Sequence, residues 1–329
     1  MLSVFMTSVQ SVLTIVLMMA AGYFARSRGW IKEGFSNSAK NVILKVALPC
    51  AVFNSMMEDF KPSQLSKLSV GLLFSIISIL VSMLIGWIVA KVFKVRPERM
   101  GLLITGITFG NTVFIGMPLN VALFGQGSIA YLLVYYIVNT ALLWTSGVWI
   151  IAHYDPTNKT GENEAKFNWS HLLPAPLWGF IVAIPFIYIH ALNSFLKNDL
   201  KFVMAGVKDL GGLVTPLSLI YIGLMIYRFG FKSLSIDKDT ILALIGRFII
   251  SALIMAGIIV AGAHMGLGLS TNVFRETLIV QAATPTFAVM PILADQYHSD
   301  IKYATNIVTW TSILFIVVTP LIMVAINYL

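Results

Sequence analysis

Long apolar runs with almost no charge are the feature that most limits how this chain can fold. Residues 68–90, for example, contain no Asp, Glu, Lys or Arg. Charged residues make up 11% of the 329 positions, against about 25% in soluble proteins, and hydrophobic residues make up 58%. A soluble protein of this composition would expose large apolar patches to water and aggregate. The sequence therefore predicts a protein that lies in a lipid bilayer.

The runs are numerous enough for a polytopic helical membrane protein. A helix needs about 20 mainly apolar residues to cross a bilayer, and the connections between the runs are short. The first run has no charged segment before it and no clear cleavage site, so we interpret it as a span and not as a signal peptide. We predict an all-α fold of about ten transmembrane helices, at residues 2–25, 36–57, 65–90, 100–123, 128–152, 170–190, 203–227, 240–262, 274–294 and 303–327.

The basic residues predict how the chain is oriented in the membrane. Thirteen Lys and Arg residues lie in or beside the odd-numbered connections, and five in or beside the even-numbered ones. Because cytoplasmic connections are enriched in Lys and Arg, the odd connections are predicted to be cytoplasmic and both termini extracytoplasmic. The net charge of +8 arises from cations scattered singly at the ends of apolar runs, a distribution that argues against nucleic-acid binding.

The chain also shows an internal repeat. A long polar stretch at residues 153–169, predicted to be a cytoplasmic linker, separates two halves of five predicted spans each, residues 1–152 and residues 170–329. Pro118 in span four corresponds to Pro291 in span nine. Because five is an odd number, the second unit enters the membrane in the opposite orientation. This arrangement is an inverted repeat, which is typical of secondary transporters.

Spans four and nine contain residues that interrupt helices. Proline lacks the backbone N–H, and glycine lowers helix propensity. In hydrocarbon an unpaired backbone group is costly, so a break persists only inside protein or beside a wet cavity. A proline kink would explain one such span, but two at corresponding places favour a crossed pair of broken helices. The residues are Gly110, Asn111, Gly116 and Pro118 in span four, and Thr284, Pro285 and Pro291 in span nine.

The two broken helices would form a receptor for an anion. Pro118 and Pro291 suit the first turn of a second half-helix, where the N–H group is not needed. The free N–H groups behind them, around residues 119–120 and 292–293, would point to the middle of the bilayer. Each helix start carries about half a positive charge, which favours a carboxylate. Asn111 would donate to the substrate or to the broken backbone.

Charged residues inside the predicted spans are further candidates. Lys45, near the middle of span two, would pair with a substrate carboxylate or with an internal partner. Arg247, in span eight, is a rival ligand for the anion, or it extends to the membrane surface. Asp209 in span seven is a candidate carrier of a coupling proton. Lys40 is nearer the end of span two and is expected to extend to the surface.

Polar residues around the prolines complete the candidate site. The predicted substrate site consists of Gly110, Asn111, Thr112, Gly116, Pro118, Asn54, Ser55, Lys45, Gln281, Thr284, Pro285, Pro291 and Arg247. Phe114, Met117 and Phe287 would add an apolar wall. Asn139 and Asn306, in spans five and ten, are interpreted as partners in hydrogen bonds between helices.

The sequence contains no motif of an enzyme or of a cofactor site. GxxxxGK[ST], HExxH and GxSxG are all absent from it. The five histidines lie at span ends or in loops without metal-ligand spacing, and the single cysteine, Cys50, excludes an internal disulfide. We therefore expect no catalytic residue, no metal and no cofactor.

Two stretches resemble a known family. GNTVFIGMPL at residues 110–119 closely resembles an element of the plant PIN auxin exporters, and QAATPTFAVMPILADQYHSD at residues 281–300 resembles their span-nine stretch. LPCAVFNSM and TPLSLIYIG resemble the proline-centred segments of spans two and seven in the wider auxin efflux carrier family. The resemblance extends over essentially the whole chain.

This resemblance implies ten spans in two inverted repeats. Spans four and nine would cross in a mobile domain, at a region that includes Pro118, Pro285 and Pro291, and spans one, two, six and seven would form a scaffold. Asn111 matches the substrate-binding asparagine of the family. Plant members carry a long phosphorylated central loop, which is short here. Compact members of bacterial type are associated with malate and malonate, an analogy that does not establish the substrate.

These features together predict a secondary transporter of the plasma membrane that carries a small organic anion by alternating access, with protons or as a uniporter. A dicarboxylate is the first choice, because two helix ends and Lys45 or Arg247 would neutralise two carboxylates. A monocarboxylate such as an indole acid is the second, and a ligand sensor or channel with the same fold is the alternative from another class. A sodium-coupled carrier would need carboxylates beside the breaks, which spans four and nine lack. The expected partners are the anion, the bilayer and protons, with a homodimer left open and no nucleic acid.

Overall fold

The computed structural model describes residues 2–32, 34–59, 68–157, 175–229 and 235–326. All regular structure in these ranges is helical, and their one extended pairing is an isolated bridge between Gly110 and Thr286. The predicted linker at residues 153–169 lies outside the described ranges from residue 158 onward.

The helices of the first half follow the predicted apolar runs. In chain order they are α1 (Leu2–Ser27), α2 (Phe35–Val42), η1 (Ile43–Ala47), α3 (Leu48–Asp59), α5 (Leu68–Val92), α6 (Pro97–Thr108), η2 (Thr112–Gly116), α7 (Met117–Phe124), η3 (Gln126–Ser128), α8 (Ile129–Leu142), η4 (Leu143–Gly147) and α9 (Val148–His153). Of these, η1, η2 and η4 are single π-helical turns, and each is continuous with an α-helix.

The second half is built in the same way. Its helices are α10 (Ala175–Tyr188), α11 (His190–Asn198), α12 (Lys201–Gly212), α13 (Val214–Phe229), α14 (Lys238–Ile245), η6 (Gly246–Ile250), α15 (Ser251–His264), α16 (Asn272–Ala282), α17 (Met290–Gln296) and α18 (Ile301–Ile326). The turn η6 is again π-helical and joins α14 to α15.

Length and composition support fewer spans than the ten predicted. Within the described ranges four helices are long and apolar enough to cross a bilayer, or six if each of two bent pairs is one span. The bent pairs are α10 with α11, at 106°, and the two parts of α18, at 59°. Predicted spans four and nine are interrupted and do not pass this test. The protein is thus a polytopic helical membrane protein. The four helices are Leu68–Val92, Gln126–His153, Lys201–Arg228 and Lys238–His264.

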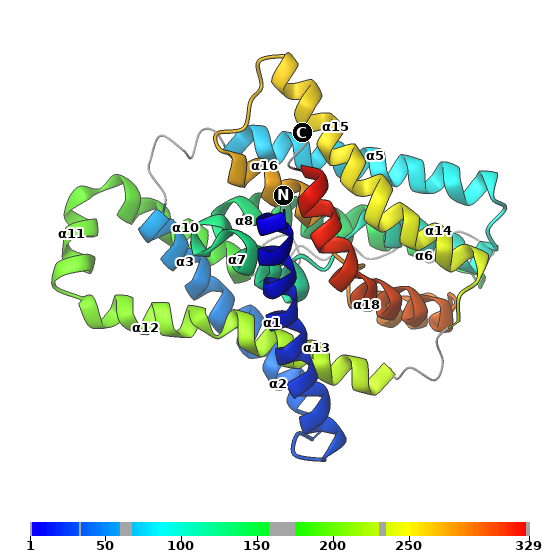
Figure 1. Ribbon diagram of the computed structural model, residues 1–329, viewed down its shortest axis with the longest axis horizontal. Coiled ribbons are helices and arrows are strands. Elements are labelled where there is room, and N and C mark those ends of the chain that lie inside the picture. Colours follow the sequence, from blue (N-terminus) through cyan, green and yellow to red (C-terminus); the bar gives the residue numbers. More distant parts are fainter. Residues whose placement is uncertain (1, 33, 60–67, 158–174, 230–234, 327–329) are drawn as a thin grey trace.

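The helices pack mainly in two groups (Figure 1). One group consists of α1, α2, α3, α10, α12 and α13, and the other consists of α5, α6, α8, α9 and α14 to α18, each linked by contacts between successive neighbours. Helix α1 also packs on α18, and α3 on α8, which joins the two groups. Small residues allow the closest approach: a Cβ atom on Gly223 of α13 would come within 2.0 Å of the Met19 carbonyl oxygen of α1. The second group contains α6, whose residues 100–108 are all buried, whereas α12 in the first group has no buried residue. The interrupted helices therefore lie in the more densely packed part of the molecule.

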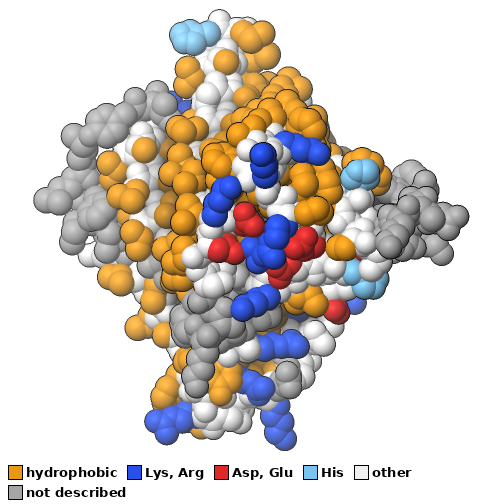
Figure 2. Space-filling view, turned by 90° about the vertical axis from the view of Figure 1, so that its right-hand side faces the viewer, with side chains coloured by type: hydrophobic (Ala, Val, Ile, Leu, Met, Phe, Trp, Pro, Cys, Tyr) orange, Lys and Arg blue, Asp and Glu red, His pale blue; other side chains and the backbone are white. Residues whose placement is uncertain are grey.

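An ion-pair network closes one end of the second group (Figure 2). Arg99 of α6 contacts carboxylate oxygens of Asp237 at 2.6 Å, Asp300 at 2.7 Å and Asp239 at 3.2 Å. Burial tends to raise the pKa of Asp237, but hydrogen bonds from Arg99 and Thr240 outweigh it and lower the pKa to about 2. Because Asp237 caps α14 and Asp300 precedes α18, the network joins the starts of α6, α14 and α18.

Candidate functional site

The first helix break lies between α6 and η2. Phe109 is extended, Gly110 has no side chain, and the helix resumes at Thr112. Asn111 is the N-cap of the resumed helix, because its Oδ1 accepts a hydrogen bond from the Phe114 N–H at 3.2 Å. A side-chain oxygen in this position stabilises a helix start whose N–H groups have no partner. Local residue chemistry thus accounts for the break.

The position of this break differs from the prediction, which placed the second half-helix at Pro118. The helix already begins at Thr112, and Pro118 follows the π-helical turn η2 in an unbroken helix. In that turn the Gly116 N–H donates to the Asn111 carbonyl at 2.9 Å. Proline cannot donate such a bond and its ring crowds the preceding turn, so a wider turn in front of it relieves the clash. The helix start next to Asn111 is therefore the one available to a ligand.

The second break, residues 283–289, is longer. Helix α16 ends at Ala282 and α17 begins at Met290, with Pro291 in its first turn as predicted. Pro285 lies inside the break, and a residue that precedes proline, here Thr284, avoids the helical conformation. The two prolines thus end one helix and start the next.

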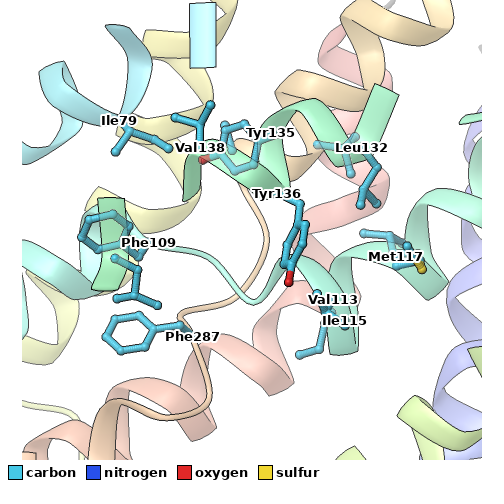
Figure 3. Close-up of a cluster of buried hydrophobic side chains, with 14 of the residues drawn as sticks. Ile79, Phe109, Val113, Ile115, Met117, Leu132, Tyr135, Tyr136, Val138 and Phe287 are labelled. Carbon is cyan, nitrogen blue, oxygen red and sulfur yellow. The ribbon is translucent and has the colours of Figure 1, made fainter. Parts of the chain in front are cut away.

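The two breaks pair with each other. Gly110 and Thr286 form an antiparallel bridge, the Asn111 N–H donates to the Pro285 carbonyl at 2.6 Å, and the Phe287 N–H donates to the Phe109 carbonyl at 3.3 Å. The rings of Phe109 and Phe287 meet edge to face, with centroids 6.4 Å apart (Figure 3). Each break thus supplies backbone partners that the other has lost, as a buried interruption requires.

Arg247 supplies further partners from η6. Its side chain is 0% exposed, so it does not extend to the membrane surface. Nη1 donates to the carbonyls of Ile107 and Thr108 at 2.9 and 2.8 Å, and Nε donates to that of Thr284 at 2.5 Å. A contact at 3.5 Å joins Nη2 to the Gln281 carbonyl. One guanidinium thus caps the carboxyl ends of both α6 and α16, where carbonyl groups lack partners and carry partial negative charge.

Side chains of neighbouring helices satisfy the remaining backbone groups. Asn139 of α8 accepts from the Gly110 N–H at 3.1 Å and donates to the Gly110 carbonyl at 3.2 Å. On the other break, the Thr286 N–H donates to Thr311 of α18 at 3.2 Å. The prediction that Asn139 and Asn306 form hydrogen bonds between elements agrees with these contacts, since Asn306 bonds to Ser235 and Thr240.

Two predicted site residues are glycines that allow close approach. A Cβ atom on Gly110 would lie 2.3 Å from Thr284 Oγ1 and 2.5 Å from Arg247 Nη2. On Gly116 it would lie 2.4 Å from Oε1 of Gln281, whose Nε2 donates to the Gly116 carbonyl at 3.0 Å. Both positions therefore exclude any side chain while the two interrupted helices are in contact.

A cavity of about 340 Å³ opens beside the first break. It lies between the two groups of helices, since α2 and η1 form one wall and α8 and η4 another. The tyrosine of that second wall, Tyr136, points its hydroxyl toward η2 (Figure 3). The cavity is lined by Lys40, Leu44, Lys45, residues 110–114, Tyr136, Asn139, Thr140, Leu143, Trp144 and residues 287–289. It combines two cations, two amides and an apolar wall.

The two lysines of this cavity have no carboxylate partner among the described residues. Lys40 belongs to α2 and Lys45 to η1, and no ion pair within the described ranges includes either. Asn111 lies opposite them, at the start of the resumed helix. Unpaired cations beside a helix N-terminus attract anions. The chemistry of the cavity therefore favours a small anionic ligand.

The structure brings together only part of the predicted site. Gly110, Asn111, Thr112 and Lys45 line the cavity. The other described members do not line it: they form the breaks or lie buried behind them, and Asn54 is buried in α3. The Ser55 side chain lies outside the described residues. Asp209 is exposed on α12 and is not a lining residue. The members that form or lie behind the breaks are Gly116, Pro118, Gln281, Thr284, Pro285, Pro291 and Arg247.

Sequence reasoning missed the wall from α8 and η4 and assigned Lys40 to the membrane surface. The missed wall residues are spaced by three and four, so they lie on one face of the helix, which is a signal that the sequence does contain. Their polar members are too few to distinguish this face from an ordinary helix contact. These residues are Tyr136, Asn139, Thr140, Leu143 and Trp144.

The chain matches the family described as membrane transport protein over residues 7–323. It belongs to that family. An uncharacterized transporter of Methanothermobacter thermautotrophicus is 26% identical over 327 residues, which cover 97% of this chain and 98% of the relative. An uncharacterized transporter of Methanocaldococcus jannaschii is 23% identical over 317 residues, which cover 94% and 96%. The protein is thus a multi-pass transporter by family, and the predicted resemblance is confirmed at the level of the family.

Proposed function

We propose that this protein is a secondary transporter that carries a small organic anion through the cavity beside the first break. The observation that carries the proposal is the meeting of Lys40, Lys45 and the Asn111 helix start around one cavity of about 340 Å³. Small-molecule sites typically occupy about 300–1,000 Å³ and combine an apolar lining with a few polar groups. A short carbon skeleton with one or two carboxylates meets both conditions.

A dicarboxylate such as malate or malonate is the first candidate. Two lysines without carboxylate partners among the described residues match two negative charges, and the amides of Asn111 and Asn139 offer donors to carboxylate or hydroxyl oxygens. In this proposal Arg247 does not contact the substrate. It holds in place the backbone next to Asn111.

The same proposal includes a ten-span fold of two inverted repeats, residues 1–152 and 170–329, with spans four and nine crossed. The antiparallel pairing of the two breaks and the two packing groups of helices support it. Alternating access would follow if the group that holds the breaks moves against the other, since the cavity lies between them. We propose that transport is either coupled to protons or a uniport. If protons are coupled, Asp209 is the candidate carrier of the proton that the sequence predicts.

The experiment is counterflow of labelled malate into liposomes that contain the purified protein, with and without a pH gradient. We expect uptake by the wild type, loss of uptake in Asn111→Ala, and a response to the gradient only if protons are coupled. Asn111→Ser is the matched variant, because a hydroxyl keeps the cap on Phe114 and removes the amide. If both variants fail to transport but melt like the wild type, the amide contacts the substrate. No uptake by intact wild-type protein contradicts the dicarboxylate proposal.

A monocarboxylate with a ring, such as an indole acid, is the second candidate. The cavity wall includes Phe114, Trp144 and Phe287, and the Phe114 ring stacks on Tyr221 with centroids 4.9 Å apart. Aromatic walls of this kind favour planar ligands. Counterflow of labelled indole acetate into the same liposomes separates the two candidates, because only a ring-accepting site carries the indole acid.

A further inference from the structure

A second hollow lies on the outer face of the helix that carries Arg247. It has two parts that share Ala256 and Ile279 in their walls. The first part, of about 330 Å³, is formed where α15 ends and α16 begins. The second, of about 450 Å³, continues along α14, η6 and α15 on one side and the end of α18 on the other. Neither part shares a lining residue with the cavity beside the first break.

The first part has a polar, cationic end. Arg275, His264, Asn272 and Thr271 line it. The Nε atom of Arg275 is buried and has no hydrogen-bond partner in the part of the chain that the structure describes. The adjacent carboxylate, Glu276, forms no ion pair with Arg275 among the described side chains. A guanidinium is suited to bind the oxygens of a phosphate through two parallel hydrogen bonds. Arg275 already interacts electrostatically with the Glu276 carboxylate, and its unpartnered N–H favours a further anionic group at this end.

The second part is apolar throughout. It is lined by aliphatic side chains and one phenylalanine, Phe248. Several of these lining residues are exposed on the surface of the protein. Ile249 is 52% exposed, Leu253 is 66% exposed and Leu321 is 59% exposed. Helix α15 packs on α5 and α16 while α18 packs on α14, and the apolar part of the hollow lies between α14, η6 and α15 on one side and the end of α18 on the other. In a bilayer these outward residues contact acyl chains.

We propose that this hollow binds an anionic phospholipid, with the phosphate at Arg275 and an acyl chain along the apolar part. A charged end and a long apolar end in one continuous hollow match an amphiphile. The polar end lies at helix ends, His264 and Asn272, which is the depth at which phosphates lie when α15 spans a bilayer. The bound lipid would buttress the helix whose inner face carries Arg247.

The test is native mass spectrometry of the purified protein with phosphatidylglycerol or phosphatidylcholine of identical chains. We expect the wild type to retain phosphatidylglycerol roughly tenfold better, because the Arg275 charge favours a net anionic headgroup over one that carries its own choline cation. Arg275→Gln should lose that preference, because it removes this charge. Arg275→Lys should keep most of it. Lys201→Gln is the matched control, since Lys201 is exposed and does not line the hollow.

A second variant tests the apolar part. Ala325 is exposed and lines the groove, so Ala325→Trp should fill it and weaken retention of both lipids several-fold. Leu84→Trp, on an exposed face of α5, should change nothing. Equal retention of the two lipids by the wild type overturns the proposal, as does Arg275→Gln that binds like the wild type. Displacement of the lipid by glycerol phosphate alone also overturns it, because the site would then recognise a soluble phosphate.

Discussion

The two helix breaks are paired, yet they contribute differently to the cavity. The first presents Gly110, Asn111 and Thr112 to it, whereas the second presents only Phe287, Ala288 and Val289. The polar lining of the cavity therefore comes from the first break and its neighbours, while the second break supplies an apolar wall. The polar groups of the second break, Thr284 among them, are instead bonded inside the protein. The comparison shows that two breaks can pair their backbones and still differ in whether their polar groups line a cavity or bond inside the protein.

The largest effect is expected at the residue that joins the breaks. Arg247→Gln removes the side-chain donor from the buried carbonyls of Thr108 and Thr284, whereas the Ile107 carbonyl keeps its hydrogen bond from Ser251. Each unpaired buried group costs about 1–3 kcal/mol, so we expect a loss of several kcal/mol and little folded protein. Thermal unfolding in detergent, followed by tryptophan fluorescence, measures the loss of stability. Arg247→Lys should be intermediate, and Arg228→Gln is the comparison at an exposed site of α13. A stable Arg247→Gln would show that water replaces the guanidinium.

The next prediction tests why a glycine stands at position 110: because the two breaks approach closely there, or because the backbone needs the flexibility of glycine. Gly110→Ala would place a Cβ atom against Thr284 Oγ1 and the Arg247 guanidinium. Overpacking of this kind typically costs about 1–3 kcal/mol, so we expect a lower melting temperature. Gly257→Ala is the matched control, because nothing lies within 4 Å of its added Cβ in α15 and alanine favours a helix. Equal melting of the two variants would contradict the tight pairing of the breaks.

A third prediction concerns binding and leaves the fold intact. Lys45→Gln removes one of two cations that face the first break, and we expect a roughly tenfold rise in KM for a dianion with little change in melting. Lys208→Gln is the control, because Lys208 pairs with Glu58 at 3.3 Å on an exposed face. Initial rates of uptake across substrate concentrations give KM and the maximal rate for each variant. An unchanged KM would remove Lys45 from the site.

Sequence alone located both breaks, because they depend on local residues. Gly110, Pro285 and Pro291 disturb a helix wherever they stand. Sequence did not place the first break correctly, since Asn111 and Pro118 are both residues typical of a helix start. The backbone pairing of Asn111 with Pro285, which distinguishes the two positions, is not visible in the sequence. The role of Arg247 was missed for a related reason: its partners are carbonyls of two other helices, and a sequence does not show which carbonyls lack partners.

The smallest expected effect tests whether the Arg99 ion-pair network, at the starts of α6, α14 and α18, also stabilises the two breaks. The Arg99 network joins α6, which leads into the first break, to α14, which leads to Arg247. Asp237 has a pKa lowered to about 2, below its unfolded value near 3.9, so its contribution is present above pH 4 and is lost as the pH falls through about 2. Because its side chain is 41% exposed, solvent screening limits this contribution to about 1 kcal/mol or less.

Melting of the wild type and Asp237→Asn at pH 7 and at pH 3 measures this contribution. We expect the variant to melt slightly lower at pH 7 and the difference to shrink as the pH falls, because protonation removes the same charge that the substitution removes. Glu58→Gln is the comparison for a carboxylate outside the network, since its pair with Lys208 lies on an exposed face. A difference that stays constant with pH would show that Asp237 acts through its cap on α14 and not through Arg99. The Arg99–Asp237 ion pair would then contribute nothing measurable to holding the breaks.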